Sequence, residues 1–462
     1  MNVSVRSQWS AGLVLGVYAF AITFAPGLGA KALLCAPLLA IPLVWWLLSD
    51  TSHWVTGFFL TAWLLPPLPV ALGNSGPHLS LFFAAVGLWM GLAYLGRWRF
   101  HFDGAALPIV VLFASLCLSL PLALLYSGPA IAALSAARVL LFAISVYLYF
   151  FVRSGPLMPR LPALLFGAAV LSALFACIDF YFQFPAPAGY GPQFIWLASG
   201  VVRRAQGFFY EASTLGNLCA FFLVFIAVSL FSPRERRPLP AWALLSGGAV
   251  LSAALVLSYS RGSLVNVFVA CAALAVFERR RIRFLRVLPV AALMGLAAGL
   301  VLFLALPDFA HAYWARMQAS AQFLFESPNA VLSGRVRTWE TLLGFLSSHP
   351  WHALLGVGYK TLPYSDFIGA PAIADNTYLS ALIETGFFGL LALLFMNAAI
   401  LRSSYLASQS SPLLGTWIFC FWCGETVQMF SGDLLTYWRV LPAYFCILAL
   451  AENDAHPVRR SV

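Results

Sequence analysis

The chain has 462 residues, of which 62% are hydrophobic and only 9% are charged, and its formal net charge is +10. A soluble globule is excluded, because so few polar groups cannot cover a water-facing surface. The positive charges are spread along the chain and form no basic domain, so we expect no nucleic-acid partner. The composition therefore predicts a polytopic membrane protein.

Long apolar segments recur along the chain, and a helix needs about 20 apolar residues to cross the hydrocarbon core of a membrane. Breaks at Pro, Gly and charge clusters give about 12 to 14 candidate transmembrane helices. The first apolar stretch lacks a small-residue cleavage site, so we expect a retained helix there and no signal peptide. The helices are expected near 10–26, 30–48, 55–71, 79–96, 106–125, 130–152, 161–182, 208–232, 239–258, 261–277, 284–306, 376–400, 412–430 and 433–451.

Arginines in alternate loops predict the orientation of these helices, because cytoplasmic loops are enriched in positive charge. An even number of helices then places both termini in the cytoplasm. The segments 183–207, 258–262, 307–375 and 431–433 fall on the outer face. The loops assigned to the cytoplasm hold Arg97, Arg99, Arg153, Arg160, Arg234, Arg236, Arg237, Arg279, Arg280, Arg281, Arg283, Arg286, Arg402, Arg459 and Arg460.

The remaining cations lie nearly all on the outer side, where orientation does not explain them. A cation inside the membrane costs several kcal/mol unless it is paired or hydrated, so such residues are candidates for function. They are Lys31, Arg138, Arg203, Arg204, Arg261, Arg316, Arg335, Arg337, Lys360 and Arg439.

A double arginine, Arg203 and Arg204, precedes Glu211 and the polar start of the next helix. Guanidinium groups bind phosphate oxygens in forked pairs, and a helix N-terminus adds backbone donors. The pattern therefore favours a phosphate-binding site. The alternative is that both arginines anchor the chain at the membrane interface, with Glu211 as their structural partner.

A compact polar turn at 257–263 interrupts a long apolar region and contains Arg261. A tight reversal of the chain explains the glycine and serines of this turn, but not an arginine at that depth. Arg261 is therefore the strongest single candidate for binding an anionic ligand. A salt bridge to Glu211 is the alternative.

The segment 307–375 is expected to be one long outer loop. Its alternating apolar and polar positions over 310–325 and 335–346 predict short amphipathic helices on the membrane surface. No spacing of His, Cys, Asp and Glu fits a metal cage, and no phosphate loop is present, so neither a metal nor another cofactor is expected. Near the second helix lie Arg335, Arg337, Trp339, the helix-ending pair His349-Pro350 and the turn glycines Gly356 and Gly358.

Asp375 stands at the outer mouth of the next apolar segment, which begins with Asn376 and Tyr378 and carries Glu384 deeper inside. Aspartate before a helix can serve as the N-cap. It can also act as a general base or orient an acceptor, which requires a carboxylate near arginines and sheltered from bulk water. The two roles are compatible.

These observations divide the chain into four parts. Residues 1–182 form an N-terminal transmembrane scaffold, and 183–306 form transmembrane helices with outer arginine motifs. Residues 307–375 form the large outer loop, and 376–462 form the C-terminal helices and a cytoplasmic tail.

Five motifs follow one another between Arg203 and Leu394. In this order, and with the long outer loop, they resemble the O-antigen ligase and Wzy-type polymerase superfamily. The motifs are Arg204-Ala-Gln-Gly207 with Glu211 and Asn217; Ser260-Arg261-Gly262-Ser263; Ser333-Gly334-Arg335 with Trp339; His349-Pro350 with Gly356-Val-Gly358; and Asp375-Asn376-Thr-Tyr378-Leu379 with Glu384-Thr-Gly386-Phe-Phe-Gly389.

The resemblance implies an all-α, GT-C-like glycosyltransferase of the bacterial inner membrane, which acts at the periplasmic face without metal or nucleotide sugar. Its donor is a glycan on undecaprenyl diphosphate, and its acceptor is a lipid-linked glycan in the membrane. A flippase and a chain-length regulator are expected nearby. By this resemblance, Arg204 and Arg261 match the arginines that hold the donor diphosphate, and Arg335 matches the arginine that opens the second loop helix. Our predicted catalytic residues are Asp375, Glu211 and Arg261, and our predicted diphosphate or glycan ligands are Arg203, Arg204, Arg261, Arg335, Arg337, Asn376 and Tyr378.

The substrate class depends on the residue before Asn376. Ligases of this superfamily usually carry histidine there, whereas this chain has Asp375. The difference favours a polymerase of O-antigen, capsule or exopolysaccharide repeats. A ligase that transfers the glycan to lipid A core is the alternative, and a transporter or flippase, which predicts pseudo-symmetric halves and broken midplane helices, is the rival from another class.

Overall fold

The computed structural model describes residues 52–277 and 334–455, except for 69–76, 94–101, 155–157, 188–189, 198–199, 367–368 and 370. It also describes scattered residues between 16 and 50 and between 304 and 329. Of the helix expected at 10–26, residues 16–26 are described and 16–24 are helical. The helices expected at 30–48, 284–306 and 310–325 fall largely outside the described residues, and so does Arg316.

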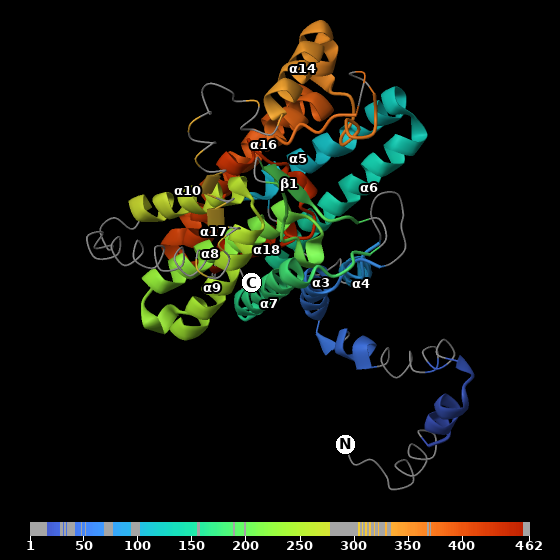
Figure 1. The fold of residues 1–462 in the computed structure, drawn as a ribbon, viewed down its shortest axis with the longest axis vertical. Coiled ribbons are helices and arrows are strands. Elements are labelled where there is room, and N and C mark those ends of the chain that lie inside the picture. The colour runs from blue at the N-terminus through green and yellow to red at the C-terminus, as the bar shows by residue number, and fades with distance from the viewer. Residues whose placement is uncertain are drawn as a thin grey trace.

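The described chain is a bundle of helices, as the sequence predicts (Figure 1). Four of them, α6, α7, α8 and α16, are long and apolar enough to cross a membrane. The helices are α3 (His53–Leu64), α4 (Ser80–Ala93), α5 (Ala106–Leu118), α6 (Leu120–Ser154), α7 (Leu161–Phe182), α8 (Ala212–Phe231), α9 (Ala241–Leu257), α10 (Arg261–Phe277), α14 (Arg335–Ser348), α15 (Pro350–Leu355), α16 (Thr377–Ser410), α17 (Pro412–Gln428) and α18 (Leu441–Ala455), with short 3-10 turns η2 (Gly207–Phe209), η3 (Arg234–Arg236) and η4 (Leu434–Thr436).

Aromatic side chains fill the centre of the bundle, where α8 meets α17 and α18. The ring of Phe221 on α8 lies 4.3 Å from that of Trp417 and 4.5 Å from that of Tyr444. The indole of Trp417 also donates to the carbonyl of Phe221 at 2.8 Å, so its polar group is satisfied. Such aromatic pairs each contribute about 0.5–1.5 kcal/mol beyond their buried area.

The helix expected at 376–400 is broken at Gly386 and runs on to Ser410. Gly386 has φ 74°, so α16 consists of a short outer piece, 377–385, and a long piece below it. A Cβ at Gly386 would lie 2.2 Å from the carbonyl oxygen of Leu354, because the end of α15 rests on the break. Only glycine permits both the backbone angle and this close approach.

The last predicted helix, 433–451, begins eight residues later than expected, at Leu441. Residues 433–440 instead form η4 and a turn at the end of the bundle that the sequence predicts to face outward. Pro442, in the first turn of α18, is compatible with a helix start because its missing N–H has no helical acceptor there.

The outer segment 183–207 contains a two-stranded antiparallel hairpin, which the all-α expectation did not include. Strand β1 (Phe194–Leu197) pairs with β2 (Gly200–Arg203) in the register Phe194↔Arg203. The backbone amide of Arg204 then donates to the carbonyl of Gln193 at 2.9 Å. The hairpin thus fixes where the chain enters α8.

The opposite end of the bundle, assigned to the cytoplasm by its arginines, holds an ion cluster around the buried Arg153. Arg153 at the end of α6 lies 2.6 Å from Asp103 and also contacts Glu452 of α18. The hydroxyl of Tyr149 donates to Glu452 at 2.5 Å. One cation therefore serves two carboxylates at this end.

Candidate functional site

Arg203 and Arg204 leave the hairpin in different directions. Arg203 forms an ion pair with Asp179 of α7 at 3.2 Å. Arg204 donates from Nε to the carbonyl oxygen of Ser258, in the α9–α10 turn, at 2.8 Å. The alternative that made Glu211 the partner of Arg203 does not hold, since Asp179 is the partner of Arg203. Arg203 is anchored, whereas Arg204 is directed toward the polar turn.

Arg204 lies within electrostatic range of the other predicted arginines. Burial lowers the pKa of Arg204, the groups of Tyr437 and Glu211 raise it, and the positive charges of Arg335 and Arg261 lower it further. Arg335 begins α14 and Arg261 begins α10, far apart in the sequence. The fold thus gathers cations from three segments that sequence analysis singled out.

Glu211 occupies the N-cap position of α8, in an extended backbone conformation. Its Oε2 accepts a hydrogen bond from Thr214 Oγ1 at 2.7 Å. Burial raises the pKa of Glu211, while Thr214 and the positive charges of Arg138 and Arg204 oppose this and the negative charge of Asp375 adds to it. The charges of the two predicted carboxylates, Glu211 and Asp375, therefore act on each other.

Asp375 is held by Arg335 and does not cap the helix. Arg335 Nε donates to Asp375 Oδ2 at 3.0 Å, and Arg335 Nη1 donates to the carbonyl of Ser431 at 2.9 Å. The helix cap is Asn376, whose Oδ1 accepts from the backbone amide of Leu379 at 3.1 Å. The N-cap alternative for Asp375 is therefore wrong, and its carboxylate remains 43% exposed.

The other predicted ligands are placed less directly. Arg337 lies on the exposed face of α14. Tyr378 donates its hydroxyl to the carbonyl of Thr426 at 2.8 Å, which directs it toward α17. Asn376 is buried and is engaged in its cap. Arg337 is thus the predicted ligand with the weakest structural link to the cluster.

Two residues of the cluster were not predicted as site residues. Arg138, on α6, acts on Glu211 by its charge. Tyr437 lies in the outer turn before α18; burial raises the pKa of its phenol, and the negative charges of Glu211, Glu425, Asp433 and Asp375 raise it further. Arg138 had been noted as a cation that topology leaves unexplained. No sequence signal marks Tyr437, because its segment resembled a helix.

Arg439, another outer cation, has a structural role. Its guanidinium donates to the carbonyl of Ala62, at 2.8 Å from Nε, and to those of Phe208 and Leu65. Ala62 and Leu65 are at the C-terminal end of α3, where carbonyls lack helical partners and a cation is favourable. Burial lowers the pKa of Arg439 to about 10. This arginine therefore caps a helix inside the bundle.

An open apolar groove of about 240 Å³ lies between α14 and α16, next to the Arg335–Asp375 pair. The indole of Trp339 at its edge donates to the carbonyl of Ala374 at 2.6 Å, which holds α14 over the start of α16. The groove continues past the break at Gly386, since Leu390 also contributes to it. It is lined by Trp339, Leu343, Asn376, Tyr378, Leu379, Leu382 and Leu390.

The helices and their composition define an all-α polytopic membrane protein with a charged cluster at one end of its bundle. Residues 246–394 match the model of a protein family described as O-antigen ligase. This match confirms the resemblance to the O-antigen ligase and Wzy superfamily and supports a glycosyl-transfer function of ligase or polymerase type. No curated protein matches the chain. The matched range includes Arg261, Arg335 and Asp375.

Proposed function

We propose that this protein polymerises oligosaccharide repeats carried on undecaprenyl diphosphate, at the periplasmic face of the bacterial inner membrane. The observation that supports this most is the convergence of Arg204, Arg261 and Arg335 with the carboxylates of Glu211 and Asp375. Guanidinium groups bind diphosphate oxygens in forked pairs, and a carboxylate beside them can act as the general base for glycosyl transfer.

The arginines are suited to hold the diphosphate of the donor. Arg204 uses its Nε for the carbonyl of Ser258, and no hydrogen bond within the described part of the chain involves its Nη1 or Nη2. The outer edge of this guanidinium can therefore form a forked contact with phosphate oxygens. Together with Arg261 it would stabilise the negative charge that develops on the leaving diphosphate, an effect of several kcal/mol in a site that excludes water.

Asp375, or failing that Glu211, would take the proton of the acceptor hydroxyl. The hydroxyl oxygen attacks the anomeric carbon in line, the bond from that carbon to the diphosphate oxygen breaks, and the diphosphate leaves with the electron pair. The anomeric centre is inverted. Because the diphosphate is a good leaving group, the reaction needs no general acid. The groove beside Asp375 is apolar and open, which suits the lipid chain of a substrate.

Ligation of the glycan to lipid A core is the second candidate, favoured by the description of the matched family. The presence of Asp375, where ligases of the superfamily usually carry histidine, favours the polymerase. Complementation of a deletion strain separates the two: loss of long chains with single-repeat capping retained indicates polymerisation, and loss of all capping indicates ligation.

The direct test is turnover of a synthetic undecaprenyl-diphosphate oligosaccharide by the purified protein, with EDTA and without nucleotide. Polymerisation predicts longer lipid-linked glycans from the wild type and none from Arg261→Ala. Arg402, exposed and assigned to the cytoplasmic side, provides a control, since Arg402→Ala should retain most activity. Binding of the substrate without elongation by the wild type would contradict the polymerase proposal and point to a different acceptor or to transport.

A further inference from the structure

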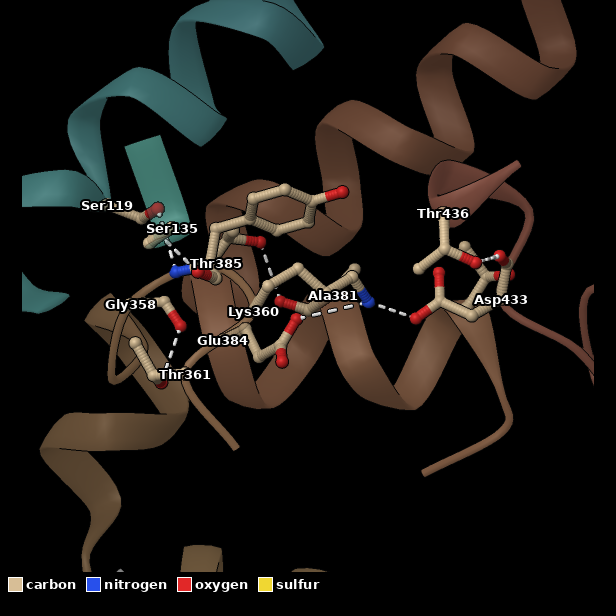
Figure 2. Close-up of polar contacts among 12 residues, drawn as sticks. Ser119, Ser135, Gly358, Lys360, Thr361, Ala381, Glu384, Thr385, Asp433 and Thr436 are labelled. Carbon is tan, nitrogen blue, oxygen red and sulfur yellow. Dashed lines mark hydrogen bonds and ion pairs between the residues drawn. The ribbon is translucent and has the colours of Figure 1, made fainter. Parts of the chain in front are cut away.

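A buried ion cluster lies beside the candidate site and contains none of the residues that contact the substrate in the proposed reaction. The ammonium of Lys360 contacts Asp433 Oδ2 and lies 3.6 Å from Glu384 Oε2 (Figure 2). All three side chains are buried or nearly so, with exposures of 7%, 13% and 2% for Lys360, Asp433 and Glu384. As in the Arg153 cluster, one cation, Lys360, pairs with two carboxylates, those of Glu384 and Asp433.

The Lys360 loop is fastened to the break in α16. The backbone amides of Val357 and Gly358 donate to the carbonyls of Ile383 and Glu384, at 3.0 and 2.9 Å. These carbonyls precede Gly386, where the helix is interrupted and its own amides no longer reach them. The loop therefore completes the hydrogen bonding of the short outer helix, 377–385.

The same loop is fastened on its other side to α5 and α6. The amide of Tyr359 donates to Ser119 Oγ at 3.1 Å, and Ser135 Oγ donates to the carbonyl of Tyr359 at 2.5 Å (Figure 2). A Cβ at Gly358 would lie 2.5 Å from the Cα of Ala123, so this contact is backbone against backbone. The loop is thus packed tightly between α16 on one side and α5 and α6 on the other.

Asp433 brings in a third segment, the turn between α17 and η4. In this turn, the carbonyl of Gly432 accepts from the amide of Thr377, the first residue of α16, at 3.1 Å, and Leu434 N donates back to Thr377 Oγ1 at the same distance. The carbonyl of Ser431 accepts from Arg335. The turn that Lys360 binds therefore also holds the start of α16 and the partner of Asp375.

We propose that Lys360 is a positioning residue for the transfer reaction. Its ammonium joins Glu384 of the outer helix to Asp433 of the turn, and so sets the place of Asp375 relative to Arg204 and Arg261. The inference rests on the proposed glycosyl transfer. Arg204 is held by the carbonyl of Ser258 in the α9–α10 turn, outside the outer helix, so a loosened outer helix should displace the carboxylate and leave this arginine in place.

The Arg153 cluster at the opposite end of the bundle supplies a matched control, because it also combines one buried cation with two carboxylates. Lys360→Met and Arg153→Met each leave two carboxylates without their cation, and both should lower the thermal unfolding midpoint. Lys360→Met should also lower kcat about 100-fold, as expected for a misplaced catalytic group. The KM of Lys360→Met for the donor should stay within about threefold of the wild-type value. The kcat and KM of Arg153→Met should stay within the same range.

A double variant separates the effect of Lys360 on the position of Asp375 from its effect on the stability of the protein. Adding Glu384→Gln to Lys360→Met removes one unpaired buried charge, so the unfolding midpoint should recover while kcat stays low. Lys360→Arg, which keeps the charge, should retain more activity than Lys360→Met. Equal losses of kcat in Lys360→Met and Arg153→Met, or full recovery of kcat with the midpoint in the double variant, would overturn the proposal.

Hydrogen exchange gives a test that needs no activity. The amides of 377–385 should exchange faster in Lys360→Met than in the wild type, and should be unchanged in Arg153→Met. Should the wild type fail to elongate any glycan while this exchange difference is seen, the proposed function fails and the positioning of Asp375 by Lys360 stands. Unchanged exchange in Lys360→Met overturns the positioning role whatever the activity.

Discussion

Arg335 and Asp375, 40 residues apart in the sequence, are joined by a hydrogen bond of 3.0 Å from Nε to Oδ2. The pair ties the first residue of α14 to the residue before the cap of α16. It is held in place yet accessible, since the side chains are 27% and 43% exposed. A buried ion pair would be a poor ligand site, whereas this one can be reached by a substrate.

Asp375→Asn keeps the shape of the side chain and its contact with Arg335, but an amide cannot take a proton from the acceptor. We expect kcat to fall about 10²- to 10⁴-fold, the usual contribution of a general base. Asp366→Asn, an exposed aspartate in the same loop, is the control and should be near wild type. Rates are measured by elongation of the synthetic donor, and a twofold effect or less at Asp375 would exclude it as the base.

Arg261→Lys keeps the positive charge but removes the forked geometry of the guanidinium. Loss of one charge-assisted hydrogen bond costs about 1.5–3 kcal/mol, so kcat/KM should fall about 10- to 100-fold. Arg402→Lys, at an exposed arginine assigned to the cytoplasmic side, is the matched substitution and should leave kcat/KM near wild type. If Arg261→Lys is fully active, the residue does not clamp the diphosphate.

Sequence analysis identified most of the arginines in the cluster because each is costly where it lies and the positive-inside pattern leaves it unexplained. The same reasoning could not separate Arg439 from Arg204, because both are outer arginines beside apolar helices. Only the fold reveals that Arg439 caps α3, whereas Arg204 donates to the carbonyl of Ser258 in the α9–α10 turn. A charged side chain in a membrane protein carries a free-energy cost that the sequence reveals. The partner that offsets this cost is determined by the tertiary structure.

The break at Gly386 and the turn at 433–440 were missed for a different reason. Both lie in apolar sequence that is compatible with a helix, and hydropathy does not record which carbonyls find partners. At Gly386 the partners come from Val357 and Gly358, about 28 residues earlier, so no local pattern encodes the break. Asp433 and Tyr437 were overlooked as site residues because their segment was assigned to a helix.

Glu211 offers a prediction about pH. Burial raises the pKa of Glu211 above its ordinary value of 4.5. If Glu211 is the base, activity should be lost as pH falls through this raised pKa, at a higher pH than for an ordinary carboxylate, and Glu211→Gln should be inactive. A pH profile of kcat/KM checks this. If Asp375 is the base, Glu211→Gln should stay active and keep the acid limb.

The raised pKa of Glu211 also makes the free energy of unfolding depend on pH, in a direction that can be predicted. A carboxyl group whose pKa is raised by folding stabilises the native state most below its unfolded pKa, and this contribution is lost as pH rises through the folded pKa. Glu211→Gln cannot ionise, so its thermal unfolding midpoint should exceed that of the wild type at neutral pH and approach it at acidic pH. Parallel melting of the two proteins in detergent over this range is the measurement.

The junction of α15 with α16 predicts that Gly386 tolerates no side chain. Gly386→Ala would place a Cβ 2.2 Å from a backbone oxygen and force an unfavourable backbone angle, at a cost of about 1–2 kcal/mol for the angle and about 1–3 kcal/mol for the overlap. Gly344→Ala, in α14, meets nothing within 4 Å and should be neutral or stabilising, since alanine favours a helix. The unfolding midpoint should therefore drop in the first variant and hold in the second. Because the break also sets the outer helix that follows Asp375, Gly386→Ala should lose activity even at temperatures where it remains folded, and retained activity there would mean that the break serves stability alone.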